Sequence, residues 1–123
     1  MADHPNAALA RQAMDNMNTG DWQKMSEFLD DDVVWHEIGR AEPRRGKAEL
    51  MESTGPTYYD IKAEVHDVVA NDEHTIALVN ATATRDGKTF KYRTAEIMHV
   101  RGGKVVERWA FSDDTAAINE FFK

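Results

Sequence analysis

The sequence predicts one α+β domain in which a curved, cone-shaped antiparallel or mixed sheet wraps around N-terminal helices and encloses an apolar pocket. Helical patterns dominate the first half of the chain, and long alternating segments fill the second half. Three turn signals divide these segments: Asn71-Asp72, Asp86-Gly87 and Gly102-Gly103. A chain of 123 residues builds only one core, so residues 1–123 form a single domain whose helices must cover the concave face of the sheet.

Two helices are expected to open the chain. The first starts near Asp3 and Pro5 and ends at residues 18–20. Its apolar side chains recur at helical spacing: Ala10, Ala13, Met14 and Met17. Asp21 caps the second helix, and the acidic residues 30–32 follow that helix. The apolar face of the second helix consists of Trp22, Met25, Phe28 and Leu29.

A short strand is predicted over residues 33–38, which are β-branched or aromatic and precede Gly39. Residues 40–45 are expected to form a polar loop. A brief helix then spans residues 47–53, and Thr54-Gly55-Pro56 ends it. This strand and helix connect the opening helices to the sheet.

Four antiparallel strands and a helix complete the chain. The strands are predicted at about Tyr58 to Ala70, Glu73 to Arg85, Lys88 to Arg101 and Lys104 to Ser112. Asp113 or Asp114 caps the last helix. The side chains expected to dock this helix on the sheet are Ala117, Ile118, Phe121 and Phe122.

Composition excludes several classes of function. The formal net charge of -7 makes nucleic acid and anionic membranes poor partners. The chain has no cysteine, no membrane-length apolar run and no signal peptide, so we expect a cytoplasmic protein. Four scattered histidines, His36, His66, His74 and His99, show no metal-ligand spacing, and no nucleotide-binding or nucleophile motif is present. We therefore expect neither a metal nor a cofactor.

Glu96 is the most informative candidate for chemistry. Alternation over residues 88–101 places it in a mostly apolar row with Tyr92 and Met98. Burying an unpaired carboxylate is costly. Glu96 is therefore a pocket acid that desolvation keeps protonated, a structural partner of an arginine such as Arg108, or a residue at a solvated strand end.

The predicted strand over residues 33–38 carries two further candidates. Alternation places Trp35 and Glu37 on one face and His36 on the other. Both rows are otherwise apolar, so the pattern leaves open which titratable side chain faces the pocket. Either one could act as a general base.

Other side chains could bind a substrate in the pocket. Tyr92 could donate its phenol hydroxyl to a carbonyl oxygen. Trp35 and Trp109 are candidates for a ligand platform or for the core, and Met14 and Met17 for the pocket wall or the core. Arg108 could line the pocket as a partner of Glu96.

Several segments in order resemble a known superfamily. They are Gly20-Asp21-Trp22, residues 28–36, Arg45-Gly46-Lys47, and residues 103–109 with Asp113. This arrangement resembles the nuclear transport factor 2-like superfamily, and within it the SnoaL-like polyketide cyclase and ketosteroid isomerase-like branch. The resemblance implies a cone with a deep apolar pocket, commonly dimerised through the outer sheet face. Members include isomerases, cyclases, dehydratases and binders, so the fold alone does not define the function.

The resemblance also implies roles for particular positions. Glu37 matches the base of ketosteroid isomerase, and Glu96 matches its protonated oxyanion donor. Two positions depart from the family. Ala13 stands where ketosteroid isomerase has its oxyanion tyrosine, and Ala110 stands where the cyclases have an acidic residue. Neither named activity therefore transfers intact.

Two main hypotheses follow. One is a cofactor-independent isomerase, cyclase or dehydratase-type enzyme that moves a proton on a small apolar carbonyl compound, with Glu37 or His36 as base and Glu96 as donor. The other is a homodimeric ligand-binding or dimerisation module without turnover. Carboxylates converging in an enclosed cavity favour the enzyme, and carboxylates held by Arg108 favour the binder. A third possibility, a structural partner domain, requires a large apolar patch on the outer face.

Overall fold

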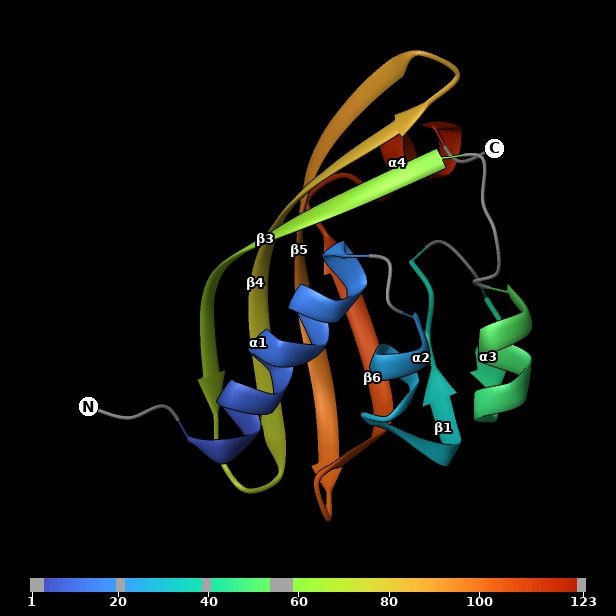
Figure 1. The fold of residues 1–123 in the computed structure, drawn as a ribbon. Helices are drawn as coiled ribbons and strands as arrows, with labels where there is room; N and C mark the ends of the chain where they lie inside the picture. The colour runs from blue at the N-terminus through green and yellow to red at the C-terminus, as the bar shows by residue number, and fades with distance from the viewer. Residues whose placement is uncertain (1–3, 20–21, 39–40, 54–58, 122–123) are drawn as a thin grey trace.

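The computed structural model describes residues 4–19, 22–38, 41–53 and 59–121, without the side chains of residues 17, 22, 51–53, 59 and 60. Within these residues the chain forms helices and strands in the order shown in Figure 1. The elements are α1 (Pro5–Asn18), α2 (Trp22–Ser26), β1 (Leu29–Trp35), β2 (Arg44–Arg45), α3 (Lys47–Ser53), β3 (Tyr59–Ala70), β4 (His74–Arg85), β5 (Lys88–Arg101), β6 (Lys104–Ser112) and α4 (Thr115–Phe121).

The strands form one mixed sheet of six strands in the order β2-β1-β6-β5-β4-β3. β3 to β6 are successive antiparallel neighbours, as the three turn signals predict. β1 pairs with β6 in parallel, and the long connection that parallel neighbours require runs through the rest of the sheet. This one parallel pair brings residues 29–35 next to the last strand.

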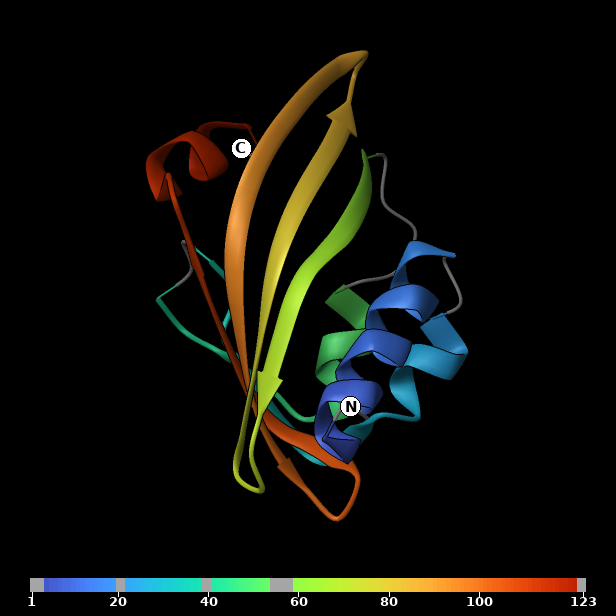
Figure 2. The same cartoon turned by 90° about the vertical axis from the view of Figure 1, so that its left-hand side faces the viewer.

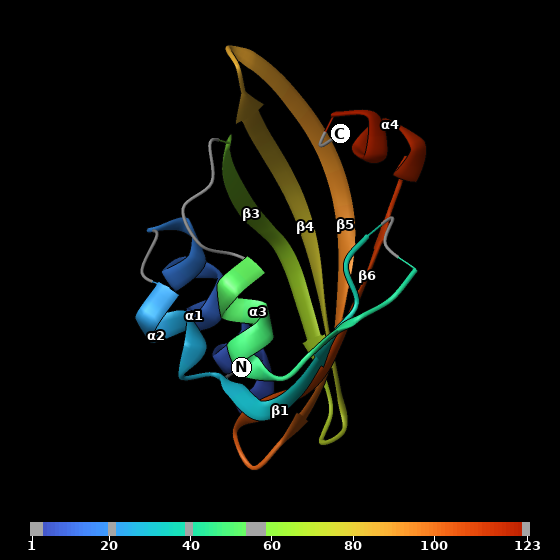
Figure 3. The same cartoon turned by 90° about the vertical axis from the view of Figure 1, so that its right-hand side faces the viewer.

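The three N-terminal helices pack on only one face of the sheet, so the two faces of the sheet differ. α1, α2 and α3 gather on one side of the long strands, which bow away from them, and α4 lies apart from this group (Figures 2 and 3). We call the face that packs on α1 the concave face. Its buried residues include Ala10 of α1, Ala77 and Val79 of β4, and Met98 of β5. The opposite, convex face carries the alternate residues of the same strands.

The predicted α+β class, the four long strands and the helix at residues 47–53 are confirmed. The last helix begins after Asp114, whose Oδ1 accepts a hydrogen bond from the backbone N–H of Ala117 at 3.0 Å, so Asp114 is the cap. Ile118 is buried, and Phe121 stacks on Phe90. The predicted roles of Asp3, Asp21, Tyr58 and Phe122 lie outside the described residues.

Three boundaries differ from the prediction. α2 ends at Ser26, so Phe28 and Leu29, expected on its apolar face, lie outside the helix. The first strand spans residues 29–35 instead of 33–38, and it includes the acidic run that was expected to follow a helix. Asp31 and Asp32 remain exposed while Leu29 and Val33 are buried, so extending the strand buries no acidic charge. The expected loop over residues 40–45 contains β2, which pairs with the end of β1.

One buried hydroxyl in the core has no partner. The side chain of Thr75 on β4 is fully buried, and its Oγ1 makes no hydrogen bond within the described residues. An unpaired buried hydroxyl retains its desolvation cost. We expect Thr75→Val, which replaces the hydroxyl by a methyl group of similar size, to raise the free energy of unfolding by about 1 kcal/mol. Urea denaturation measures this change. The exposed Thr84→Val is the control, and a loss of stability in Thr75→Val would contradict the assignment.

Candidate functional site

The concave face carries an ion pair between β5 and β6. Glu96 lies between the buried Thr94 and Met98, and Arg108 on β6 is the register partner of Met98. Arg108 Nε donates to Glu96 Oε1 at 3.0 Å, and Arg108 Nη2 donates to the same oxygen. Both side chains are only 12% exposed. Of the three alternatives that the sequence leaves open for Glu96, the structure therefore shows the pairing with Arg108.

Two further contacts hold the Arg108 guanidinium. Its Nη1 donates to the backbone carbonyl oxygen of His36 at 3.0 Å, and its Cζ lies 4.4 Å from the centre of the Trp35 ring. A guanidinium has more N–H groups than these three hydrogen bonds use. Both contacts from the guanidinium to Glu96 reach Oε1, so Oε2 has no partner within the described residues. The pair thus retains both a donor and an acceptor for a ligand.

A second ion pair lies beside Trp35. Glu37 follows the end of β1, and its Oε1 accepts a hydrogen bond from Arg44 Nε at 2.7 Å. Arg44 is the register partner of Trp35, so its side chain points to the same face as the Trp35 ring. The sequence indicated Arg44 only as part of a basic, polar loop, because nothing in the run at residues 40–45 signals a strand of two residues. The two pairs together carry no net charge.

His36 and Trp109 occupy the convex face. Trp109 is the register partner of Ile97, which alternates with Glu96 and Met98 on β5. The His36 ring stacks on Trp109 with 5.4 Å between centroids and an interplanar angle of 4°. Its Nε2 bonds Glu107 Oε2 at 2.8 Å. The His36 and Trp109 side chains therefore lie on the face opposite Glu96 and Arg108, while Trp35 and Arg44 accompany Arg108.

The remaining candidates lie on the concave side where they are described. Met14, Trp35 and Tyr92 are partly buried and pack against the core. Tyr92 also stacks on Phe90 at 5.3 Å. The side chain of Met17 lies outside the described residues. The concave site therefore brings together Glu96, Arg108, Trp35, Glu37 and Arg44, with Met14 and Tyr92 in the adjoining apolar wall.

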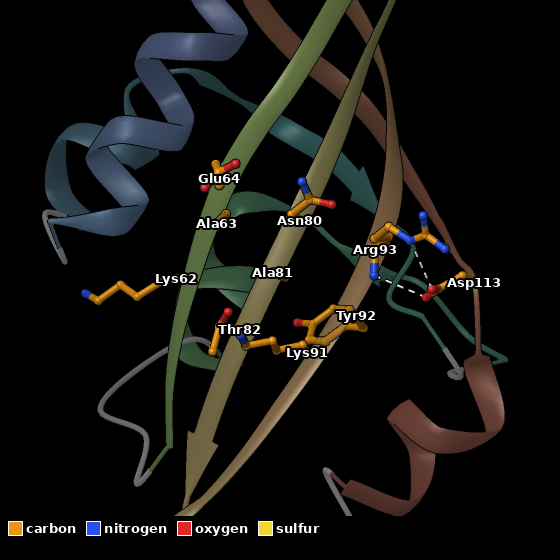
Figure 4. A pocket seen from close by; sticks show the side chains of 10 residues that line it. All are labelled: Lys62, Ala63, Glu64, Asn80, Ala81, Thr82, Lys91, Tyr92, Arg93 and Asp113. Carbon is orange, nitrogen blue, oxygen red and sulfur yellow. Dashed lines mark hydrogen bonds and ion pairs between the residues drawn. The ribbon is translucent and has the colours of Figure 1, made fainter.

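The convex face has a polar end and an apolar end. The polar end contains a hollow of about 580 Å³ whose polar side chains come from three strands: Lys62, Glu64, Asn80, Thr82, Lys91 and Arg93. Figure 4 shows Arg93 reaching Asp113 beside this hollow. The backbone N–H of Arg93 donates to Asp113 Oδ1 at 3.1 Å, and this bond lowers the pKa of the Asp113 carboxyl. This region thus carries both signs of charge, with three basic and two acidic side chains.

The apolar end of the convex face is uncovered within the described residues. Val69 is 55% exposed, Leu78 41% and Phe111 61%. The strand register joins these side chains into two neighbouring rows, one through Ile97 and Trp109 and one from Leu78 to Phe111. Contiguous apolar side chains of this kind commonly mark an interaction surface.

A family model decides the classification. The model of the SnoaL-like domain matches residues 10–108, which include the concave site from Met14 to Arg108. The chain belongs to the SnoaL-like domain family. This family lies in the nuclear transport factor 2-like superfamily, as the sequence resemblance predicts. Members of the superfamily include isomerases and cyclases.

Solved structures agree with the SnoaL-like fold. Bal32a, from a soil-derived mobile gene cassette, is 25% identical with a TM-score of 0.83, and the match covers 97% of both chains. A candidate ketosteroid isomerase from Kribbella flavida DSM 17836 is 21% identical with a TM-score of 0.77, covering 89% of this chain and 78% of that chain. TerC, co-crystallised with polyporic acid, is 17% identical with a TM-score of 0.82, covering 95% and 97%. At these identities the likeness establishes the fold.

One further comparison and two features of the structure give negative findings for this SnoaL-like chain. Curated proteins give no match by sequence. Among the helices that the structure describes, none has the length and apolar composition to cross a membrane. Across all the residues that the structure describes, no three His, Asp or Glu side chains lie closely enough together to bind a metal ion.

Proposed function

We propose that this SnoaL-like protein is a cofactor-independent enzyme that transfers a proton on a small, apolar, carbonyl-containing molecule at the concave site. The observation that carries this proposal is the one-oxygen contact between Arg108 and Glu96. It leaves an ionised carboxylate oxygen free beside unused guanidinium N–H groups. Such a pair can accept a proton and donate hydrogen bonds to a neighbouring oxygen. The neutral sum of the two ion pairs suits an uncharged substrate.

The roles of the two acids follow from their partners. Glu96 Oε2 accepts the proton from the carbon next to the carbonyl, and Arg108 donates to the carbonyl oxygen as negative charge develops on it. This exchanges the role that the family resemblance implies for Glu96, because a carboxylate beside a guanidinium is held in its ionised form. The proton held on Glu96 Oε2 then returns to a carbon of the substrate, and Glu37, fixed by Arg44, orients the substrate. Trp35, Met14 and Tyr92 supply apolar contact.

The test needs no knowledge of the product. A panel of hydrophobic ketones and lactones is screened by thermal shift, and each binder is then incubated with the protein in deuterated water. Catalysed exchange of the hydrogen next to the carbonyl, followed by NMR, supports the proposal. Binding without any exchange above the buffer rate would contradict the catalytic function.

A non-catalytic ligand-binding module is the second candidate. The engagement of both carboxylates by arginines favours it, since each acid then has a structural partner. Ala13 and Ala110, at positions where catalytic relatives have functional side chains, favour it further. In this case the same screen gives stabilising ligands and no exchange.

We propose that the partner of this chain is a second copy of itself, docked on the apolar end of the convex face. The exposure of Val69, Leu78 and Phe111 supports this assignment. Helices on one face of a sheet leave the other face to be covered by association. Because the concave site lies on the opposite face, such a dimer leaves that site free.

We predict that Phe111→Asp disrupts this dimer interface. Phe111 is the most exposed large apolar side chain of the described residues, and a charge buried between two copies is costly. We expect the variant to weaken dimerisation by about 100-fold or more, as measured by analytical ultracentrifugation. Thr84→Asp, an exposed position outside the apolar rows, is the matched control. A wild-type protein that sediments as a monomer at every concentration excludes the dimer.

A further inference from the structure

His36 contacts both faces of the sheet through different parts of the residue. On the convex face its ring stacks on Trp109 and donates through Nε2 to Glu107. On the concave face its carbonyl oxygen accepts from Arg108 Nη1 at 3.0 Å. Its backbone N–H donates to the Arg108 carbonyl oxygen at 2.9 Å. One residue thus joins the convex anchor to the guanidinium that holds Glu96.

His36 lies directly after the end of β1, so these contacts hold its backbone in place. β1 ends at Trp35, and the N–H of His36 makes the last hydrogen bond of the β1–β6 ladder, so the His36 carbonyl lies beyond that ladder. What holds it is the bond to Arg108 and the anchored ring. Glu107 and the imidazole are each about one-third exposed. A ring held by a hydrogen bond and a parallel stack has little rotational freedom, and it fixes the direction of the attached carbonyl.

That carbonyl direction determines how Arg108 presents Glu96. The guanidinium is planar, and three groups set its plane: Glu96 Oε1, the Trp35 ring and the His36 carbonyl oxygen. Without the His36 carbonyl, the plane can turn about the axis that joins the other two contacts. The Glu96 carboxylate would turn with the Arg108 guanidinium, because its Oε1 accepts both hydrogen bonds from that group. The free oxygen Oε2 would then lose its fixed direction.

We propose that His36 is a positioning residue: its ring, anchored on the convex face by Glu107 and Trp109, fixes the carbonyl that orients Arg108 and thereby aims Glu96 Oε2. The functional value of this arrangement rests on the proposed role of Glu96 in proton transfer. The contact between the His36 carbonyl oxygen and Arg108 does not depend on that role. His36 therefore assists the reaction from the face opposite the substrate, without touching it.

The first measurement is the solvent exchange of the Arg108 Nε–H, observed by NMR in the full-length protein. His36→Ala removes both ring anchors, and we expect the exchange to rise about tenfold or more, as for the weakening of one charge-assisted hydrogen bond. His36→Gln keeps a donor for Glu107 and should restore part of the protection. His66→Ala, at an exposed histidine on β3, is the matched control and should leave the exchange unchanged.

The second measurement is the exchange of the substrate's carbon-bound hydrogen with a ketone found in the screen. We expect His36→Ala to lower kcat with KM nearly unchanged, because substrate contacts remain while the base is misdirected. If His36→Ala does not fold, the same two measurements on His36→Gln and His36→Phe, each of which keeps one anchor, decide the matter.

The outcomes separate the two proposals. Arg108 Nε–H exchange that stays at the wild-type rate in the folded variants overturns the positioning role, whatever the turnover. Faster exchange in His36→Ala, combined with normal turnover in Glu96→Gln, keeps the positioning role and overturns the proposed function. Faster exchange with reduced kcat in His36→Ala supports both.

Discussion

Arg108→Met is expected to lower the free energy of unfolding by about 3–5 kcal/mol. The substitution keeps most of the apolar stem of the side chain but removes the guanidinium from a site where both partners are 12% exposed. Glu96 would then be left with a charge that water reaches poorly and no protein group neutralises. The His36 carbonyl and the Trp35 ring would lose their contacts as well. Urea denaturation followed by tryptophan fluorescence measures the loss.

Two further variants identify the cause of this loss. Combining Arg108→Met with Glu96→Leu removes both charges, and we expect most of the stability to return, because a buried pair replaced by apolar groups is often neutral. Arg101→Met, an exposed arginine at the end of the same hairpin, should change stability by less than about 0.5 kcal/mol. A single Arg108→Met variant as stable as Arg101→Met would mean that water enters the site and replaces the guanidinium.

The sheet and one of its ion pairs could be predicted because their signals are local. Turn dipeptides such as Asp86-Gly87 set the strand ends, and alternation along β5 placed Glu96 in an apolar row. A buried carboxylate needs a partner, and Arg108 on the next strand was the named candidate. Strand pairing then confirmed the contact. A period of two and the cost of a buried charge thus limited Glu96 to three alternatives, one of which is the observed ion pair.

The second ion pair and the choice of the convex face for His36 could not be predicted, because they depend on contacts distant in sequence. β2 has only two residues and acquires its register from β1, so Arg44 carries no recognisable pattern. Alternation correctly placed His36 opposite Trp35 and Glu37, but it could not tell which of the two rows faces the helices. Trp109 and Glu107, more than seventy residues further along, draw the His36 ring to the convex face.

Glu96→Gln tests the proposed chemistry with the smallest change in shape. The amide oxygen can still accept a hydrogen bond from Arg108, while the amide nitrogen that replaces Oε2 cannot accept a proton at neutral pH. Loss of a general base commonly costs a factor of about 100 to 10,000 in rate. We expect a loss of this size in kcat for hydrogen exchange at the carbon next to the carbonyl, with ligand binding retained in the thermal-shift assay.

Glu37→Gln is the matched comparison, because Glu37 is also an arginine-paired carboxylate beside Trp35. It is 33% exposed against 12% for Glu96, so water already solvates part of its charge. We expect a smaller loss of kcat for Glu37→Gln than for Glu96→Gln. The reverse order would make Glu37 the base, as the family resemblance implies, and would leave Arg108 and Glu96 as a structural pair. Wild-type rates in both variants would remove proton transfer by carboxylates altogether, and ligand binding would remain as the function of the concave site.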